Sequence, residues 1–311
     1  MSRPTLPGTP EAGTTRLRQI ALVARDLKKA EELLTKVIGT EVIYVDPGVE
    51  KWGLKNILVA IGGEVIEVVS PFKPGTTAGR QLDKRGDGGY MIIMQTIDAK
   101  KRKEHIESKG LAKVIYTHES KGSYGVQYHP KGILGPYHDS LNIVSNLLTA
   151  LAGGVLPELD SHEPTEEIPK PVTARFSPWY PCGPDANSYL PAMKKYGHLS
   201  LLGAVCRVAP GQGTGEEASR QWEQIFGVAR SRDLLAFTNA RVGFITGHPG
   251  EQEGIVRITI GVVGQRRIDG ILERAEEMGV LRTDGSRRWV DMIGVEWNFS
   301  LTGEDERPSK L

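Results

Sequence analysis

The sequence predicts an α+β fold in which one β-α-β-β-β unit is repeated along the chain. Residues 17–71 read as an alternating strand, an amphipathic helix and three short β-rich runs, in that order. A strand followed by a helix and further short β-runs begins again near residues 89, 199 and 254. Turn residues such as Gly62-Gly63 separate the runs. An internal repeat is the most economical interpretation of these observations.

The first unit can be justified element by element. Residues 17–24 alternate between two faces, as a strand does. Asp26 can cap the helix that follows, because its carboxylate can accept hydrogen bonds from the free N–H groups of a first turn. Apolar residues then recur at helical spacing until Gly39, which ends the helix. The last of the three β-runs places Glu67 on a face with Val65 and other apolar residues.

The rest of the chain sets the expected domain organisation. Residues 73–89 form a long polar, Gly-rich connection, for which we expect a lid or rim. A second module follows with a strand from residue 89, a helix and three strands, the last of them within 134–144. We predict a flexible tail at 1–15, a first domain with the site at 16–144, a Pro-rich strap at 145–196, a second, degenerate domain at 197–303 and a tail at 304–311. A mobile linker in place of an ordered strap remains open.

Composition excludes several classes of partner. The 311 residues include 39 basic and 38 acidic residues, so the net charge of +1 gives no general attraction for nucleic acid or an anionic membrane. Cys182 and Cys206 are far apart in the sequence, which fits a reducing compartment and offers no disulfide framework. No apolar run reaches the ~20 residues that cross a bilayer. We therefore expect a cytoplasmic protein whose partner is a small molecule.

The motifs of the first unit resemble the vicinal oxygen chelate superfamily. A strand ends in Asp26-Leu27, a helix ends in Ile38-Gly39, and the last strand has the spacing G-x-x-x-E from Gly63 to Glu67. This superfamily includes glyoxalase I, methylmalonyl-CoA epimerase, extradiol dioxygenases and bleomycin-resistance proteins. Residues 46–80 and 85–98 are similar to its glyoxalase-like domain proteins. The resemblance implies two domains, each of paired β-α-β-β-β modules that form a cupped mixed sheet.

The resemblance also implies where a metal would bind. It places Gln19 at the first-strand ligand position and Glu67 at the last-strand position. Counting four residues from Gly135 gives Asp139 the equivalent last-strand position in the second module. Oxygen ligands of this kind suit one divalent ion, Mg²⁺, Mn²⁺ or Fe²⁺, with Zn²⁺ also retained. Structural alternatives stay open: an arginine or backbone partner for Glu67, and a hydrogen bond to the neighbouring strand for Gln19.

The second module departs from the metal-dependent enzymes, because Tyr90 or its neighbour stands where the first-strand histidine is expected. Tyr90 is either a hydrogen-bond donor to substrate or a core aromatic residue. His129 either supplies the missing imidazole or is an ordinary hydrogen-bonded histidine before a proline. We expect His118 at the rim. Trp52 and Trp179 are candidates for the substrate wall, although aromatic residues are more often core.

Two classes of function follow from the resemblance. One is a glyoxalase-like enzyme, an isomerase or lyase, that acts on a small carbonyl or hydroxyl compound by metal-assisted or carboxylate general-base proton transfer. The alternative is a metal-free small-molecule binding or sequestering protein of the bleomycin-resistance type. An extradiol dioxygenase is less favoured, because two histidines of its ligand triad are missing. A homodimer through exposed strand edges is common in the superfamily, and the sequence does not decide it.

Overall fold

A computed structural model describes residues 15–304, except residues 134–153 and the single residues 167, 173, 178, 184 and 232. Sixteen strands form two eight-stranded sheets. The first sheet has the strand order β2-β3-β4-β1-β5-β8-β7-β6. Its strands are β1 (Arg16–Val23), β2 (Val42–Tyr44), β3 (Leu54–Ile61), β4 (Glu64–Pro71), β5 (Gly88–Gln95), β6 (Ala112–Ser120), β7 (Ser123–Ile133) and β8 (Leu156–His162).

The second sheet repeats this order as β10-β11-β12-β9-β13-β16-β15-β14. Its strands are β9 (Leu199–Arg207), β10 (Arg230–Ser231), β11 (Leu234–Ala236), β12 (Arg241–Ile245), β13 (Gly254–Val263), β14 (Leu281–Asp284), β15 (Arg287–Met292) and β16 (Val295–Gly303). In three of the modules the last strand is parallel to the first, as β8 is to β5, β12 to β9 and β16 to β13. The predicted internal repeat and the α+β class are confirmed.

Each module has its helix after the first strand, where the sequence predicts one. These helices are α1 (Leu27–Glu32), which continues as the π-helical η1 (Leu33–Ile38), α3 (Ala99–Ser108), α5 (Gly215–Phe226) and α6 (Gln265–Glu277). The other helical segments are η2 (Pro47–Trp52), α2 (Thr77–Arg85), η3 (Ala186–Ser188) and α4 (Leu190–Lys195). Asp26 caps α1, since its side chain accepts from the backbone N–H of Lys29. No helix among the described residues is long and apolar enough to cross a membrane.

The chain divides into two compact units, each assembled from separate segments of the sequence. Unit 1 combines the chain up to Ala21 with Gly89–Pro181 and Gly203–Val256, and unit 2 combines Leu22–Gly88, Cys182–Leu202 and the chain from Arg257. Each unit therefore contains strands of both sheets. The domain boundaries that the sequence suggests, at 144 and 196, stay a prediction.

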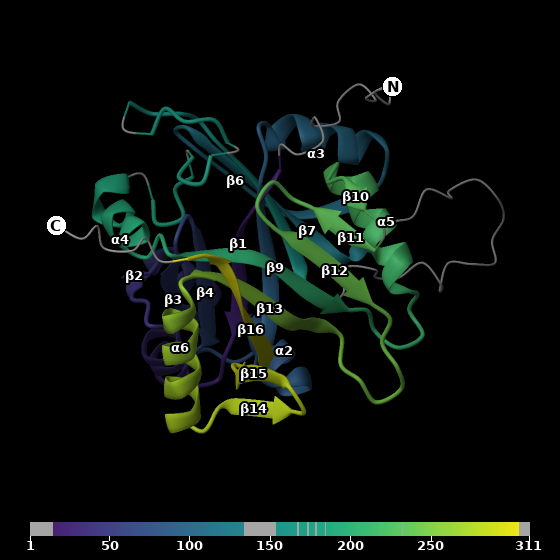
Figure 1. The fold of residues 1–311 in the computed structure, drawn as a ribbon. Helices are drawn as coiled ribbons and strands as arrows, with labels where there is room; N and C mark the ends of the chain where they lie inside the picture. The colour runs from purple at the N-terminus through teal and green to yellow at the C-terminus, as the bar shows by residue number, and fades with distance from the viewer. Residues whose placement is uncertain are drawn as a thin grey trace, which may run out of the picture. The chain divides into compact units, whose positions relative to one another are not determined.

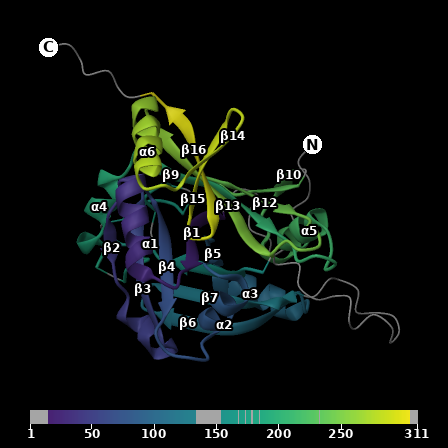
Figure 2. The same ribbon diagram turned by 90° about the horizontal axis from the view of Figure 1, so that it is seen from below.

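In unit 1, α5 packs on β11 and β12, and α3 packs on β7 and β8 (Figures 1 and 2). The ring of Trp222 lies 4.9 Å from Phe226 and 5.3 Å from Phe244, between ring centroids. Tyr128 of β7 meets Phe226 edge to face at 5.6 Å. Aromatic residues from the two halves of the sequence thus form one core.

In unit 2, α6 packs along β16 and against η1 (Figure 1). Arg274 of α6 donates from Nε to the backbone oxygens of Lys36 and Val37, at 2.8 and 3.1 Å. Gly39 ends η1 with a φ of 81°, the left-handed conformation that favours glycine. The predicted end of this helix is confirmed.

Two sequence expectations differ from the structure. The segment 73–89 contains the helix α2, whose cap is Thr76, because Oγ1 accepts from the backbone N–H of Gly79 at 2.8 Å. The strand that pairs in parallel with β5 is β8, which falls inside the segment assigned to the strap. The strand expected within 134–144 lies outside the described residues.

Arg102 of α3 gives the first testable prediction. Its side chain is buried and donates from Nε to the oxygen of Ile225 and from Nη2 to that of Gln224, both at 2.7 Å. Burial lowers the pKa of Arg102 to about 10, so it stays a cation at pH 7. Arg102→Met removes the donors to both carbonyl groups at the end of α5, of which that of Ile225 is buried. We expect a loss of about 2–4 kcal/mol in the free energy of unfolding, measured by urea denaturation.

Lys101→Met is the matched control, because Lys101 is the exposed neighbour of Arg102 on the same helix. We expect it to change the unfolding free energy by less than about 0.5 kcal/mol. Equal effects of the two substitutions would show that Arg102 does not hold α3 and α5 together.

Candidate metal and proton-transfer site

The site lies in unit 1 and is organised by β8. Glu158 and Asp160 are two residues apart on this strand, so both side chains stand on the same face of the sheet. Both are buried, with exposed fractions of 9% and 6%. The neighbouring strand β7 places Gln127 opposite Glu158, and its Nε2 donates to Oε2 of Glu158 at 2.7 Å. β8 therefore carries two acidic groups into the interior of the unit.

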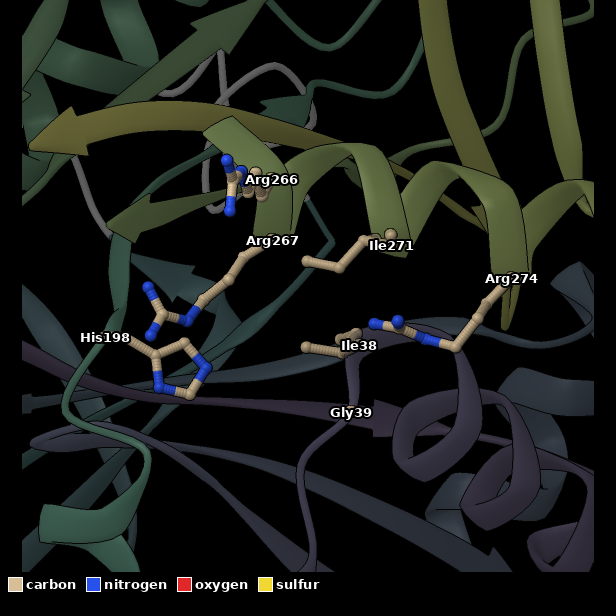
Figure 3. A pocket seen from close by; sticks show the side chains of 8 residues that line it. Ile38, Gly39, His198, Arg266, Arg267, Ile271 and Arg274 are labelled. Carbon is tan, nitrogen blue, oxygen red and sulfur yellow. The ribbon is translucent and has the colours of Figure 1, made fainter. Parts of the chain in front are cut away.

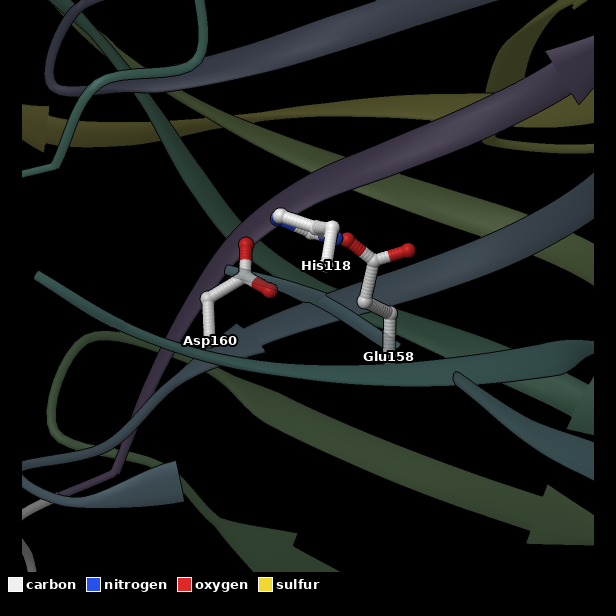
Figure 4. Close-up of side chains that lie close together, drawn as sticks. All are labelled: His118, Glu158 and Asp160. Carbon is white, nitrogen blue, oxygen red and sulfur yellow. The ribbon is translucent and has the colours of Figure 1, made fainter. Parts of the chain in front are cut away.

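His118 completes the cluster from β6. The strand registers place His118 opposite Gly125 and Gly125 opposite Asp160, so the three residues form one row across the sheet. A Cβ atom at Gly125 would collide with the imidazole of His118 and would lie 2.7 Å from Oδ1 of Asp160. Glycine is needed here because the histidine ring occupies the space above it. Figure 4 shows the ring beside the two carboxyl groups.

Burial dominates the protonation of the two acids. Burial and the charge of Asp160 raise the pKa of Glu158, while His118 and Gln127 oppose the shift, and the pKa is about 8. Burial raises the pKa of Asp160 to about 7, partly offset by Glu158 and Trp179. Near neutral pH the buried pair therefore stays partly protonated in the absence of a cation, because burial disfavours two adjacent charges.

The surroundings of Asp160 are also buried. Nε2 of His162 lies 3.9 Å from Oδ2 of Asp160. Burial, helped by the charge of Arg18, lowers the pKa of His162 to about 4, so this contact is not an ion pair at pH 7. Arg18 donates from Nε to Gln95 at 2.7 Å, and its guanidinium lies 5.4 Å from the ring centroid of Trp179. These contacts fix the side chains behind the acidic pair.

The cluster fits a divalent cation. His118, Glu158 and Asp160 each offer one ligand atom, and these atoms lie within 4.8 Å of one another. Oδ1 of Asp160 is buried and has no hydrogen-bond partner among the described residues. One imidazole nitrogen and two carboxylate oxygens suit Mn²⁺, Fe²⁺ or Zn²⁺, and a cation would also balance the buried negative charge.

The ligand set that the sequence suggests lies partly on two neighbouring strands of the first sheet. Gln19 is buried in β1, and Glu67 lies in β4, where it accepts from Nδ2 of Asn56 at 2.6 Å. Asp139 lies outside the described residues. Metal ligation by Gln19, Glu67 and Asp139 stays a prediction.

The other candidate residues lie on several elements, and their proposed roles stay predictions. Tyr90 is half-buried and packs against a cluster of Ala21, Met91, Ile93 and Leu156. His129 is half-buried on β7. Trp52 is 45% exposed beneath Nζ of Lys51, which lies 4.2 Å from its ring centroid. Trp179 is buried beside Arg18 and Asp160, so it is the candidate that lies next to the acidic cluster.

Sequence reasoning missed Glu158 and Asp160 although a signal exists. Gly154 and Glu158 repeat the G-x-x-x-E spacing of Gly63 and Glu67. The neighbouring Pro-rich chain led us to assign this segment to a strap. Nothing local in the sequence marks His118, because its position depends on the pairing of β6, β7 and β8.

These pKa shifts predict how stability depends on pH. The folded pKa values of Glu158 and Asp160 exceed the ordinary values of about 4.3 and 3.9, so the folded state binds more protons than the unfolded state up to about pH 8. The free energy of unfolding therefore falls as pH rises through this range. The lowered pKa of His162 makes the free energy of unfolding rise with pH, but only between about pH 4 and 6.5. We therefore expect the free energy of unfolding to fall between pH 6.5 and 8, by about 1 kcal/mol more in the wild type than in Glu158→Gln.

Urea denaturation at pH 6.5 and pH 8 measures this difference in the absence of metal. Glu163→Gln is the control, because Glu163 follows β8 but is exposed. An identical pH dependence in wild type and Glu158→Gln would contradict the buried, protonated state of Glu158.

Comparison with known proteins finds similar solved structures. No family model and no curated protein matches the chain. Methylmalonyl-CoA epimerase from Streptomyces coelicolor is similar to 48% of this chain over 99% of its own length, at 22% identity and a TM-score of 0.38. The epimerase from Mycobacterium tuberculosis covers 49% of this chain and 91% of its own, also at 22% identity and a TM-score of 0.38.

A hypothetical protein from Staphylococcus aureus is similar over a much longer range. It covers 92% of this chain and 99% of its own, at 12% identity and a TM-score of 0.53. This likeness agrees with the repeated strand order of the two sheets. The chain therefore shares the fold of that hypothetical protein, in which the paired modules predicted from the sequence form two sheets.

Proposed function

We propose that this protein is an enzyme of the isomerase type that acts on a small carbonyl or hydroxyl compound in unit 1, with His118, Glu158 and Asp160 holding a divalent cation. The observation that supports this most directly is the cluster itself, in which two buried acids and one histidine offer ligand atoms within 4.8 Å. Buried carboxyl groups are destabilising unless something compensates their charge, so their presence favours a functional role.

The side chains support proton transfer. A bound cation would polarise a substrate carbonyl and stabilise the negative charge that develops on its oxygen. Without a cation, burial raises the pKa values of the acidic pair toward neutrality, which is the range in which a carboxylate can both accept and return a proton. In an isomerisation, a C–H bond next to the carbonyl breaks, the proton passes to a carboxylate oxygen, and the enolate that remains takes a proton back.

The neighbouring residues would support this role. His118 is the half-buried member of the cluster, so it is the one through which the site meets solvent. Gln127 holds Glu158 in place by its hydrogen bond, and Trp179 covers the side of Asp160. The isomerase class follows the sequence resemblance, and the substrate is defined only by its chemistry as a carbonyl or hydroxyl compound.

A metal-free binding protein is the second candidate. One feature favours it: burial raises the pKa values of Glu158 and Asp160, so protonation can remove their buried charge without a cation. In that case the site would hold a ligand by hydrogen bonds and would show no turnover. Metal binding and its dependence on these residues separate the two candidates.

Titration of metal-free protein with Mn²⁺ by isothermal calorimetry tests the proposal. We expect about one equivalent to bind, with the affinity reduced more than about 10-fold in Glu158→Gln, because one ligand loses its charge. Gly125→Ala should weaken binding similarly while keeping all three ligands, because its Cβ displaces the ring of His118. Each variant is compared by circular dichroism to confirm folding.

Two further variants make the test specific. Glu119→Gln is the matched control on β6, since Glu119 is exposed beside His118 and should leave the affinity unchanged. Glu67→Gln examines the ligand set implied by the sequence resemblance. Loss of Mn²⁺ binding in Glu67→Gln but not in Glu158→Gln would show that Glu67, and not Glu158, is a metal ligand. Absence of Mn²⁺ binding by the wild type would favour the metal-free binding protein.

A further inference from the structure

A cavity in unit 2 shares no residue with the proposed site. It has a volume of about 410 Å³ and opens between α6, the end of η1 and the segment before β9. The lining residues are Ile38, Gly39, His198, Arg266, Arg267, Gly270, Ile271 and Arg274. Figure 3 shows the side chains of Arg267 and His198 beside each other, with Arg274 extending from α6 over Gly39.

The charge of this cavity is strongly positive. Three arginines line it, and none of its lining residues is acidic. Arg266 and Arg267 stand in the first turn of α6, which has no acidic residue and no side-chain cap. Cations at a helix N-terminus are unfavourable, because the helix dipole already makes this end positive. An anion in the cavity would relieve the repulsion among these groups.

Arg274 is held in position for such a ligand. Its Nε is occupied by the carbonyl oxygens of Lys36 and Val37, whereas its terminal nitrogens make no hydrogen bond to a described residue. A Cβ at Gly39 would lie 3.3 Å from Nη2, and one at Gly270 would lie 3.1 Å from Nη1. Two glycines thus leave room for the guanidinium group, whose planar donors match the oxygens of a phosphate.

The remaining surface is apolar. Ile38 and Ile271 face the cavity between the charged groups (Figure 3). The volume falls within the ~300–1,000 Å³ of small-molecule sites and exceeds what one phosphate group needs. We propose that this cavity binds the phosphate group of a small phosphorylated organic molecule, with Arg266, Arg267 and Arg274 on the phosphate and the two isoleucines against the organic part. This proposal goes beyond the isomerase site and does not depend on it.

Isothermal calorimetry with ADP, inorganic phosphate and adenosine tests the proposal on the full chain. We expect ADP to bind more tightly than inorganic phosphate, adenosine not to bind, and the affinity for ADP to fall as salt rises. Arg266→Gln and Arg267→Gln should each weaken ADP binding about 10-fold or more, because each removes one charged donor.

Arg288→Gln is the matched control, because Arg288 is an exposed arginine of β15 outside the cavity, and it should leave the affinity unchanged. Folding of each variant is confirmed by its melting temperature, and Arg266 makes no hydrogen bond or ion pair with a described residue that its loss would break. Equal affinity for phosphate and ADP would contradict the proposed contact between the isoleucines and the organic part of the ligand. Absence of binding, or equal affinity in Arg266→Gln and the wild type, would overturn the site.

Discussion

Two carboxyl groups buried on one strand set the main constraint on unit 1. Glu158 and Asp160 would repel each other if both were charged, and burial makes each charge unfavourable. Protonation of the pair, the hydrogen bond that Gln127 donates to Glu158 and the imidazole of His118 all reduce this cost. The absence of a side chain at Gly125 is part of the same solution, because it lets the imidazole reach Asp160. A chain that keeps such a cluster only for packing would be more stable with apolar residues there.

The same strand links the site to the core of the unit. β8 lies between β5 and β7, and α3 packs on β7 and β8. Arg102 of α3 in turn binds the end of α5, which comes from the second half of the sequence. The module that contains α5, with Phe244 buried against Trp222, therefore supports the module that carries the acidic pair. This gives the second half of the chain a structural role in unit 1.

Much of the fold could be predicted from the sequence, and less of the site. Local sequence signals between Leu17 and Gly39 predict the first strand, the cap of the following helix and the glycine that ends this helix. The structure contains each of these features. The repeat is visible because the same order of elements recurs. The strand β8 was not predicted, because the G-x-x-x-D spacing from Gly135 to Asp139 suggested another last strand for the second module. The neighbouring prolines also hid the G-x-x-x-E spacing from Gly154 to Glu158. The contact of His118 with Asp160 could not be predicted, since it joins strands about 40 residues apart through register alone.

The central claim is that unit 1 holds a cation between His118, Glu158 and Asp160. A crystal of the protein soaked in Mn²⁺, with data collected at the manganese absorption edge, tests it most directly. Our account predicts one anomalous peak about 2.1–2.3 Å from His118 nitrogen and from oxygens of Glu158 and Asp160. A peak at Glu67 with none at this cluster, or an empty cluster at saturating Mn²⁺, would contradict it.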